Sequence, residues 1–332
     1  MVRDPFGETG ARLLRWRACV LGARLEFSSN SRELLAIARE AFARQPQHRW
    51  PRGAPPTLRV NFKLVPEDSA AKRALPPKPG LSSGAGLLCA HIDSQNFAVV
   101  DPAGGRALVQ VGESTLRHRQ LVRYELVEFA AITLATRAQG LVPLHGGCVG
   151  ARGRGVLLLG SSGSGKSTLA LHAALDGLEF LAEDSVFVHP TTMCATGLSA
   201  YVHARGDAVK LIRDQRARHA VGRAPRIQRR SGVRKHEVDL RHGLVRLAHA
   251  PMQIVATVVL SARRARGTAS LAPLTAQQLR RELRAEQPYA AGQPGWQEFE
   301  RRVLRAGGFR LDRMPLADGV SSLRKLLEEH KA

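Results

Sequence analysis

Residues 160 to 167 read Gly-Ser-Ser-Gly-Ser-Gly-Lys-Ser, which is the phosphate-binding pattern G-x-x-x-x-G-K-[ST]. In this pattern glycine backbone N–H groups cradle phosphate oxygens, the lysine contacts the β- and γ-phosphates, and the last hydroxyl contacts Mg²⁺. An apolar run at 155–159 predicts a strand before the loop, and 167–175 predicts a helix after it, whose N-terminus favours anions. We therefore predict nucleotide contacts from Gly160, Ser161, Ser162, Gly163, Ser164, Gly165, Lys166, Ser167 and Thr168.

An acidic pair, Glu183 and Asp184, follows Lys166 by 17 and 18 residues. Apolar residues flank the pair on both sides, which favours the end of a buried strand over a solvated turn. Phosphoryl transfer needs carboxylates that ligate Mg²⁺ or accept the proton of the acceptor hydroxyl. The spacing also argues against common phosphate-loop GTPases and ATPases, whose metal carboxylate lies much further along the chain. We predict that this pair belongs to the site.

Three segments together resemble the catalytic core of the HPr kinase/phosphorylase family: 144–147 (Leu-His-Gly-Gly), the loop, and 181–186 (Leu-Ala-Glu-Asp-Ser-Val). In that family a His-Gly pair precedes the loop, and an acidic pair follows it, at the same intervals. The resemblance covers about residues 141–190, with a fainter echo to about 206. It implies an α/β fold: a P-loop, phosphoenolpyruvate carboxykinase-like catalytic domain of the HPr kinase C-terminal type, with an N-terminal α+β domain.

The resemblance also implies a role for each matched residue. Lys166 would hold the β- and γ-phosphates, and Ser167 would ligate Mg²⁺. Asp184 would be the general base toward a serine hydroxyl. Glu183, where the family usually has Asp, would act beside it on the metal side. His145, 21 residues before Lys166, would occupy the family's active-site histidine position, although a lone histidine in a Gly-rich strand end is more often structural.

The chain departs from the family further downstream. The family has a glutamate that completes the metal site, followed one residue later by Arg-Gly. Here 203–206 read His-Ala-Arg-Gly, so His203 stands where the glutamate would be. This departure argues against a second metal site and against the family's reverse, phosphate-dependent dephosphorylation. We can align the family's later arginine with no single residue; Arg234 is one candidate.

The chain is strongly basic, with a formal net charge of +22 over 332 residues and a pI near 11.3. Such a charge is compatible with nucleic-acid binding. Arginine replaces lysine almost everywhere, however, which indicates a compositional bias, and an aromatic content of 5% leaves few stacking platforms. We therefore expect ATP and an acidic protein or peptide as partners, and no nucleic acid.

The most basic stretch is 205–246, for which two interpretations remain open. It could clamp ATP phosphates or receive an acidic substrate, or it could be a mobile charged loop. The segment 222–232 has little apolar content and predicts an exposed loop, and 231–236 could close over the site as a lid.

The sequence predicts a cytoplasmic protein with no membrane contact. No run of 18 apolar residues occurs, and arginines at 12, 15, 17 and 24 interrupt the start of the chain. The four cysteines are far apart, so we expect them to be reduced and mostly buried.

Composition and periodicity predict two domains: 1–138, a substrate-binding or regulatory α+β domain, and 139–332, the catalytic domain. Strands are predicted at 17–27, 57–65, 87–100, 106–111, 141–150, 155–159, 185–189, 254–260 and 309–314, with 254–260 in the centre of the catalytic sheet. Helices are predicted after a cap at 29–31, and at 114–137, 167–175, 275–286, 297–306 and 319–331. Loops are predicted at 45–56 and 67–86.

These patterns together predict an ATP- and Mg²⁺-dependent kinase that transfers the γ-phosphate to a hydroxyl, that of a serine in a protein or peptide. Two alternatives remain: a small-molecule kinase, and an ATP-gated binding or regulatory module without phosphotransfer. The resemblance also suggests a homo-oligomer. The acceptor itself cannot be named from the sequence.

Overall fold

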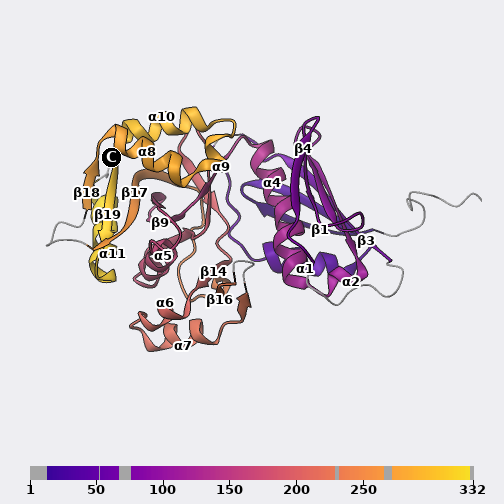
Figure 1. The fold of residues 1–332 in the computed structure, drawn as a ribbon, viewed down its shortest axis with the longest axis horizontal. Helices are drawn as coiled ribbons and strands as arrows, with labels where there is room; N and C mark the ends of the chain where they lie inside the picture. Colours follow the sequence, from indigo (N-terminus) through magenta and orange to yellow (C-terminus); the bar gives the residue numbers. More distant parts are fainter. Residues whose placement is uncertain (1–12, 52, 67–75, 229–231, 265–270, 330–332) are drawn as a thin grey trace, which may run out of the picture. The chain divides into compact units, whose positions relative to one another are not determined.

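The computed structural model describes residues 13–51, 53–66, 76–228, 232–264 and 271–329. They form a mixed α/β structure, as predicted, in two compact units (Figure 1). Unit 1 comprises Met1–Ala43 and Arg52–Gln139, and unit 2 comprises Arg44–Pro51 and Gly140–Ala332. Among the described helices, none has the length and apolar content needed to cross a membrane.

Unit 1 is a seven-stranded sheet in the order β1-β2-β3-β7-β6-β5-β4. Apolar residues of α1 and α4 are buried against one face of it, where alternate strand residues such as Phe27, Val60 and Val109 are also buried. The strands are β1 Leu14–Val20, β2 Ala23–Ser29, β3 Thr57–Val65, β4 Gly80–Gly84, β5 Leu87–His91, β6 Phe97–Asp101 and β7 Arg106–Gly112. The helices are α1 Arg32–Phe42, α2 Glu113–Leu116, α3 Arg119–Leu121, the π-helix η1 Val122–Glu128 and α4 Phe129–Ala138.

Several predictions for unit 1 need correction. The single strand predicted at 17–27 is the hairpin β1–β2, because Leu21 and Gly22 adopt positive φ angles of 51° and 86° and reverse the chain. The strand predicted at 87–100 is divided into β5 and β6, and β4 lies inside the loop predicted at 67–86. The helix predicted at 114–137 is divided into α2, α3, η1 and α4.

Other predictions for unit 1 are confirmed. Ser31 caps α1 by accepting a hydrogen bond from the Leu34 N–H, and β3 has the predicted bounds.

Unit 2 contains a nine-stranded sheet whose main path is β11-β9-β10-β17-β13-β12-β8, and β19 and β18 extend it from β17. The long strand β17 pairs with β10, β13 and β19, so the prediction of a central strand at 254–260 is confirmed. The strands are β8 Val142–His145, β9 Gly147–Ala151, β10 Arg154–Leu159, β11 Glu179–Ala182, β12 Ser185–Val188, β13 Cys194–Gly197, β17 Met252–Arg264, β18 Leu271–Leu274 and β19 Gly308–Arg313. The predicted strand 141–150 is therefore two strands, β8 and β9, which Gly146 separates.

Helices cover both faces of this sheet (Figure 1). On one face α5 (Lys166–Leu175) and α11 (Leu316–Glu329) share a core with Leu158, and on the other α8 (Ala276–Glu286), α9 (Pro288–Ala291) and α10 (Trp296–Ala306) share a core with Leu157. Because successive strand residues point to opposite faces, β10 must be apolar throughout, which explains the run at 155–159.

A three-stranded sheet in the order β14-β16-β15 forms the basic part of unit 2. Its strands are β14 Tyr201–Ala204, β15 Arg226–Gln228 and β16 Arg234–Asp239, and α6 Gly206–Lys210, α7 Gln215–Arg223 and the 3₁₀ turn η2 Leu240–His242 accompany them. The prediction of a loop at 222–232 is wrong where β15 lies, and residues 229–231 are outside the described residues. The predicted lid at 231–236 is strand β16 from Arg234 onward, and closure of this segment over the site stays a prediction.

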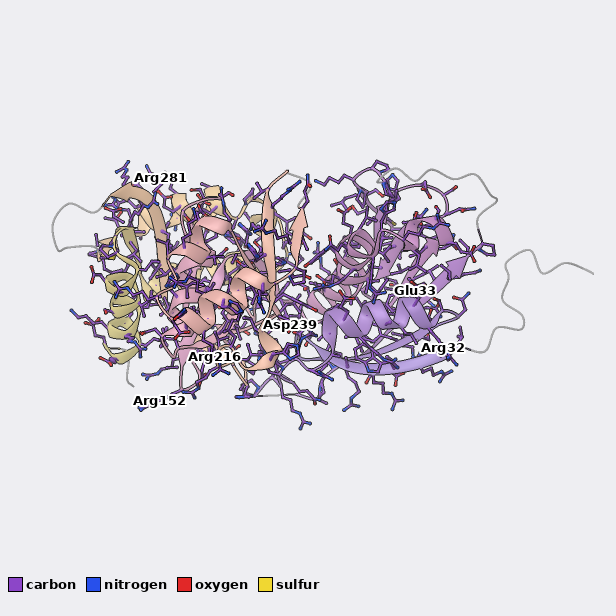
Figure 2. The ribbon with its side chains drawn as sticks, turned by 90° about the horizontal axis from the view of Figure 1, so that it is seen from below. Arg32, Glu33, Arg152, Arg216, Asp239 and Arg281 are labelled. Atoms are coloured by element: carbon purple, nitrogen blue, oxygen red, sulfur yellow. The ribbon has the colours of Figure 1, made fainter. Side chains whose placement is uncertain are left out.

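Arginine side chains are spread over the surface of unit 2, as Arg152, Arg216 and Arg281 illustrate (Figure 2). Of the four cysteines, Cys148 and Cys194 are buried and Cys19 and Cys89 are half-buried; all are free.

The segment 44–51 packs with unit 2, although the sequence-based division placed it in the first domain. His48 is buried and anchors this segment: Nδ1 lies 2.7 Å from Thr196 Oγ1, and Nε2 lies 2.9 Å from the Ala248 carbonyl oxygen. The contacts use both ring nitrogens, so His48 acts structurally.

Candidate functional site

The glycine loop links the end of β10 to the start of α5 and takes an open, curved path. Gly163 and Gly165 have φ angles of 86° and 104°, a region that favours glycine, and no atom lies within 4 Å of where their Cβ atoms would be. At Gly160 a Cβ would lie 2.6 Å from the Leu260 carbonyl oxygen, so the loop leaves the sheet in close contact with β17. The Ser164 hydroxyl is buried and lacks a hydrogen-bond partner among the described residues, as a group that awaits a ligand oxygen would.

Lys166 opens α5 and folds back over the loop. Its side chain is buried, and Nζ donates hydrogen bonds to the carbonyl oxygens of Gly160 at 2.5 Å and Ser161 at 3.2 Å. Burial lowers the pKa of Lys166, and the carboxylates of Glu286, Asp184 and Glu183 partly offset this effect. The ammonium is thus held at the loop with no carboxylate of the described residues in direct contact, which suits it to an anionic ligand.

Glu183 lies at the end of β11 and is 3% exposed. Its Oε1 accepts hydrogen bonds from the backbone N–H of His203 at 3.0 Å and from His203 Nδ1 at 3.1 Å. Burial would raise the pKa of Glu183, but the bonds and charge of His203, with help from the Ser167 hydroxyl, lower it overall. Its Oε2 is buried and makes no well-formed hydrogen bond within the described residues, even though Ser167 is close enough to favour the charged form.

Strand pairing brings a further carboxylate to this place. His203 on β14 lies directly opposite Glu237 on β16, and His203 Nε2 is 3.6 Å from Glu237 Oε1. All three side chains, those of Glu183, His203 and Glu237, are buried. We refer to them as the Glu183 cluster. The sequence offered no signal for Glu237, because its place depends on the pairing of strands that lie far apart in the chain.

His145 and Asp184 meet at the ends of neighbouring strands. His145 Nδ1 lies 3.4 Å from Asp184 Oδ1 and 3.2 Å from the Asp184 carbonyl oxygen, and the Gly146 N–H donates to that same carbonyl. The two side chains are 52% and 47% exposed, so both can contact a molecule from solvent. The geometry is that of an exposed carboxylate beside an imidazole ring, next to the buried Glu183.

Gln287 fixes the backbone of His145, and the sequence analysis missed it. Its Oε1 accepts from the His145 N–H at 2.7 Å, and its Nε2 donates to the His145 carbonyl oxygen at 2.8 Å. The side chain is 2% exposed. A glutamine just after α8 carries no motif, and 142 residues separate it from His145, so no local pattern could have revealed it.

A pocket of about 330 Å³ opens beside the loop at Ser161. The end of β17, strand β18 and helix α8 form its walls. Aliphatic side chains there include Val259, Leu260 and Leu274, and Gln278, Glu282 and Glu286 add polar groups. Glu286 is also the carboxylate that most favours the charged form of Lys166, so this pocket and the loop share one electrostatic environment.

The sequence-predicted site residues thus fall into three neighbouring groups of unit 2. The loop residues 160–168 surround Lys166, Glu183 lies buried near Ser167, and Asp184 contacts His145. The carboxylates of Glu183 and Asp184 both influence Lys166 electrostatically, which links the three groups. Lys235 on β16 also acts on Lys166, by repulsion, so the basic stretch extends to the site.

The fold and site therefore define a mixed α/β protein with a strand–glycine-loop–helix arrangement and an acidic pair beside it. No family model matches this chain, and comparison with curated proteins finds no match.

Proposed function

We propose that this protein is an ATP- and Mg²⁺-dependent kinase that transfers the γ-phosphate to a serine hydroxyl of a protein or peptide. We further propose that unit 2 is a P-loop, phosphoenolpyruvate carboxykinase-like domain of the HPr kinase type. The observation that carries the proposal is that two differently placed carboxylates act electrostatically on the loop lysine: Glu183 is buried and Asp184 is half exposed. A metal-side acid and a solvent-accessible base need those two environments.

The residues fit the groups that the reaction needs. Gly163 and Gly165 leave open space along the loop, and the buried Ser164 hydroxyl has no partner among the described residues, which suits phosphate oxygens. Ser167 and the free Oε2 of Glu183 would hold Mg²⁺, a cation that prefers oxygen ligands and neutralises phosphate charge. The pocket beside Ser161 would receive the nucleoside part, because it offers aliphatic walls and polar groups together.

Asp184 would accept the proton of the serine hydroxyl. It faces solvent, from which an acceptor side chain must enter, and His145 lies against it. His145 orients this carboxylate and contributes a polar contact to the transferred group. The formal net charge of +22 favours an acceptor with acidic neighbours.

The alternative is an ATP-gated binding module without phosphotransfer. It uses the same loop and the same Lys166, so Lys166→Ala weakens nucleotide binding under both proposals. Asp184 separates them, because only a kinase needs a base at the acceptor. The exposure of Asp184 beside His145, at a place that no phosphate contact requires, favours the kinase.

The test compares wild type with Asp184→Asn, and with Asp318→Asn as a matched control at an exposed aspartate in the first turn of α11. Each protein is incubated with ATP, Mg²⁺ and the proteins encoded beside its gene, and new phosphoserine is measured by mass spectrometry. We expect Asp184→Asn to lower transfer about 10²- to 10⁴-fold, with binding of a fluorescent ATP analogue unchanged. Normal transfer by Asp184→Asn would remove Asp184 as the base, and absence of transfer by wild type would favour the binding module.

A second variant tests whether the position of His145 matters. Gln287→Ala removes both hydrogen bonds that hold the His145 backbone, so we expect transfer to fall about tenfold while analogue binding stays unchanged. Gln287→Glu keeps the acceptor for the His145 N–H and should retain more activity than Gln287→Ala. Equal transfer by wild type and Gln287→Ala would show that the hydrogen bonds from Gln287 to the His145 backbone are only structural.

A further inference from the structure

The starting point is the unequal use of the two oxygens of Glu183. Oε1 accepts two hydrogen bonds, from the backbone and the ring of His203, while Oε2 has none within the described part of the chain. A buried carboxylate oxygen without a partner is costly, and a bound ligand or an ordered water is one way in which a fold satisfies it. The carboxylate is therefore anchored on one side and open on the other.

His203 is the anchor, and its hydrogen-bonding pattern can be assigned. An ionised carboxylate can only accept, so Nδ1 must carry the proton that it donates to Glu183 Oε1. The other ring nitrogen, Nε2, faces Glu237 Oε1 at 3.6 Å. Each ring nitrogen thus faces a carboxylate, and register on β14 and β16 fixes the ring between them.

This arrangement is not that of a second metal site. No group of three His, Cys, Asp or Glu side chains among the described residues could hold a metal ion, and the Glu183 cluster is no exception. Both ring nitrogens of His203 are directed at carboxylates, so neither faces an open position where a metal ion could bind.

We propose that His203 is a positioning residue: it holds Glu183 Oε1 so that Oε2 points toward Mg²⁺ beside Ser167, and Glu237 orients the His203 ring. This inference rests on the proposed function. It also explains why a histidine suits the position where the resembled family has a glutamate. Here residue 203 supplies a hydrogen-bond donor to Glu183 instead of a further carboxylate.

The expected loss of metal affinity follows from how residues that hydrogen-bond to a metal ligand affect metal binding. Loss of such a partner typically weakens metal binding about 10- to 100-fold, because the ligand gains rotational freedom. Nucleotide binding without metal should not depend on His203, because the phosphates contact the loop.

The experiment compares His203→Asn with His203→Gln in the full-length protein. The amide nitrogen of asparagine can take the place of Nδ1 and donate to Glu183, whereas the longer glutamine places its amide near the position of Nε2, toward Glu237. Binding of Mn²⁺, as a probe for Mg²⁺, is measured by electron paramagnetic resonance with a non-hydrolysable ATP analogue. Affinity for the analogue without metal and the melting temperature are measured for each variant.

We expect His203→Gln to weaken Mn²⁺ binding at least about tenfold and His203→Asn to stay within about threefold of wild type. Metal-free affinity for the analogue should be unchanged in both. Wild-type Mn²⁺ affinity in both variants, or an equal loss in both, would overturn the positioning role. Absence of Mn²⁺ binding by the wild type with the analogue would overturn the proposed function as well, so the two failures can be distinguished.

Discussion

Each unit buries an ionic cluster, and the two clusters differ in whether every buried polar atom has a partner. In unit 1, Arg123 is 1% exposed and donates from Nε to Glu128 at 2.9 Å and from Nη1 to Glu40 at 3.1 Å. No side-chain atom of these three residues is buried without a partner in the described structure. In the Glu183 cluster of unit 2, by contrast, Oε2 of Glu183 is buried and has no hydrogen-bond partner among the described residues.

This difference separates a structural cluster from a candidate functional one. A buried charge stabilises a fold only when its partners satisfy it, and removal of one partner is strongly destabilising. A buried oxygen left without a partner reduces stability, and functional sites are one place where natural proteins retain such groups. The Arg123 cluster should therefore affect stability alone, and the Glu183 cluster should affect metal binding more than stability.

The largest expected effect comes from Arg123→Met. Removal of the guanidinium leaves Glu40 and Glu128 without their buried partner, so we expect the free energy of unfolding to fall by about 3–5 kcal/mol. Chemical denaturation measures this loss. Arg119→Met is the matched control, because Arg119 also pairs with Glu40 but its side chain is 42% exposed, and its loss should stay below about 1 kcal/mol.

Two outcomes of the Arg123→Met experiment would contradict the distinction between the two clusters. Equal stability of Arg123→Met and wild type would show that the cluster contributes nothing. Weaker binding of an ATP analogue by the folded variant would show that the cluster has a role beyond stability.

Glu183→Gln should have the opposite effect to Arg123→Met: a small loss of stability and a large loss of metal binding. The amide can keep its oxygen toward His203, so we expect a stability loss of about 1 kcal/mol. Its NH₂ group then replaces Oε2 and cannot ligate a cation, so Mn²⁺ binding in the presence of the analogue should weaken at least about tenfold. Denaturation and metal titration on the same sample check both parts. A stability loss as large as that of Arg123→Met, with unchanged metal binding, would show that the Glu183 cluster is structural, as the Arg123 cluster is.

The smallest expected effect is a pH dependence of stability at the ion pair of Arg284 and Glu300, in which both carboxylate oxygens accept hydrogen bonds. Arg284 donates to both oxygens of the buried Glu300, at 2.7 and 3.0 Å, and these hydrogen bonds lower the pKa of Glu300 below its ordinary value of 4.5. The charged form therefore stabilises the fold above pH 4.5, and this contribution is lost as the pH falls through the lowered pKa. The gap in melting temperature between wild type and Glu300→Gln should be present at pH 7 and close below pH 4.5.

Glu282→Gln serves as the control, since Glu282 pairs with the exposed Arg281, and its gap at pH 7 should be smaller than that of Glu300→Gln. A Glu300→Gln gap that persists well below pH 4.5 would mean that packing, and not the ion pair, causes it.

Local patterns predicted the elements that local physics controls. The cap at Ser31, the helix predicted at 275–286 and the apolar run of β17 each lie where the sequence placed them. The errors fall at turns: Leu21 adopts a positive φ angle that its residue type disfavours, so the β1–β2 hairpin gave no usual turn signal. In the candidate site, Lys166 and Asp184 could be named from spacing, but Gln287 and Glu237 could not.

The sequence alone determined the glycine loop, because its positive φ angles and its charge come from residues that are adjacent in the chain. It also determined the apolar strand β10, whose carboxyl end carries the loop. The tertiary structure decided which side chains complete the site. Strand pairing places Glu237 opposite His203, and the packing of α8 and α9 brings Gln287 to His145. Contacts between residues so far apart depend on the whole fold, since no local preference encodes them.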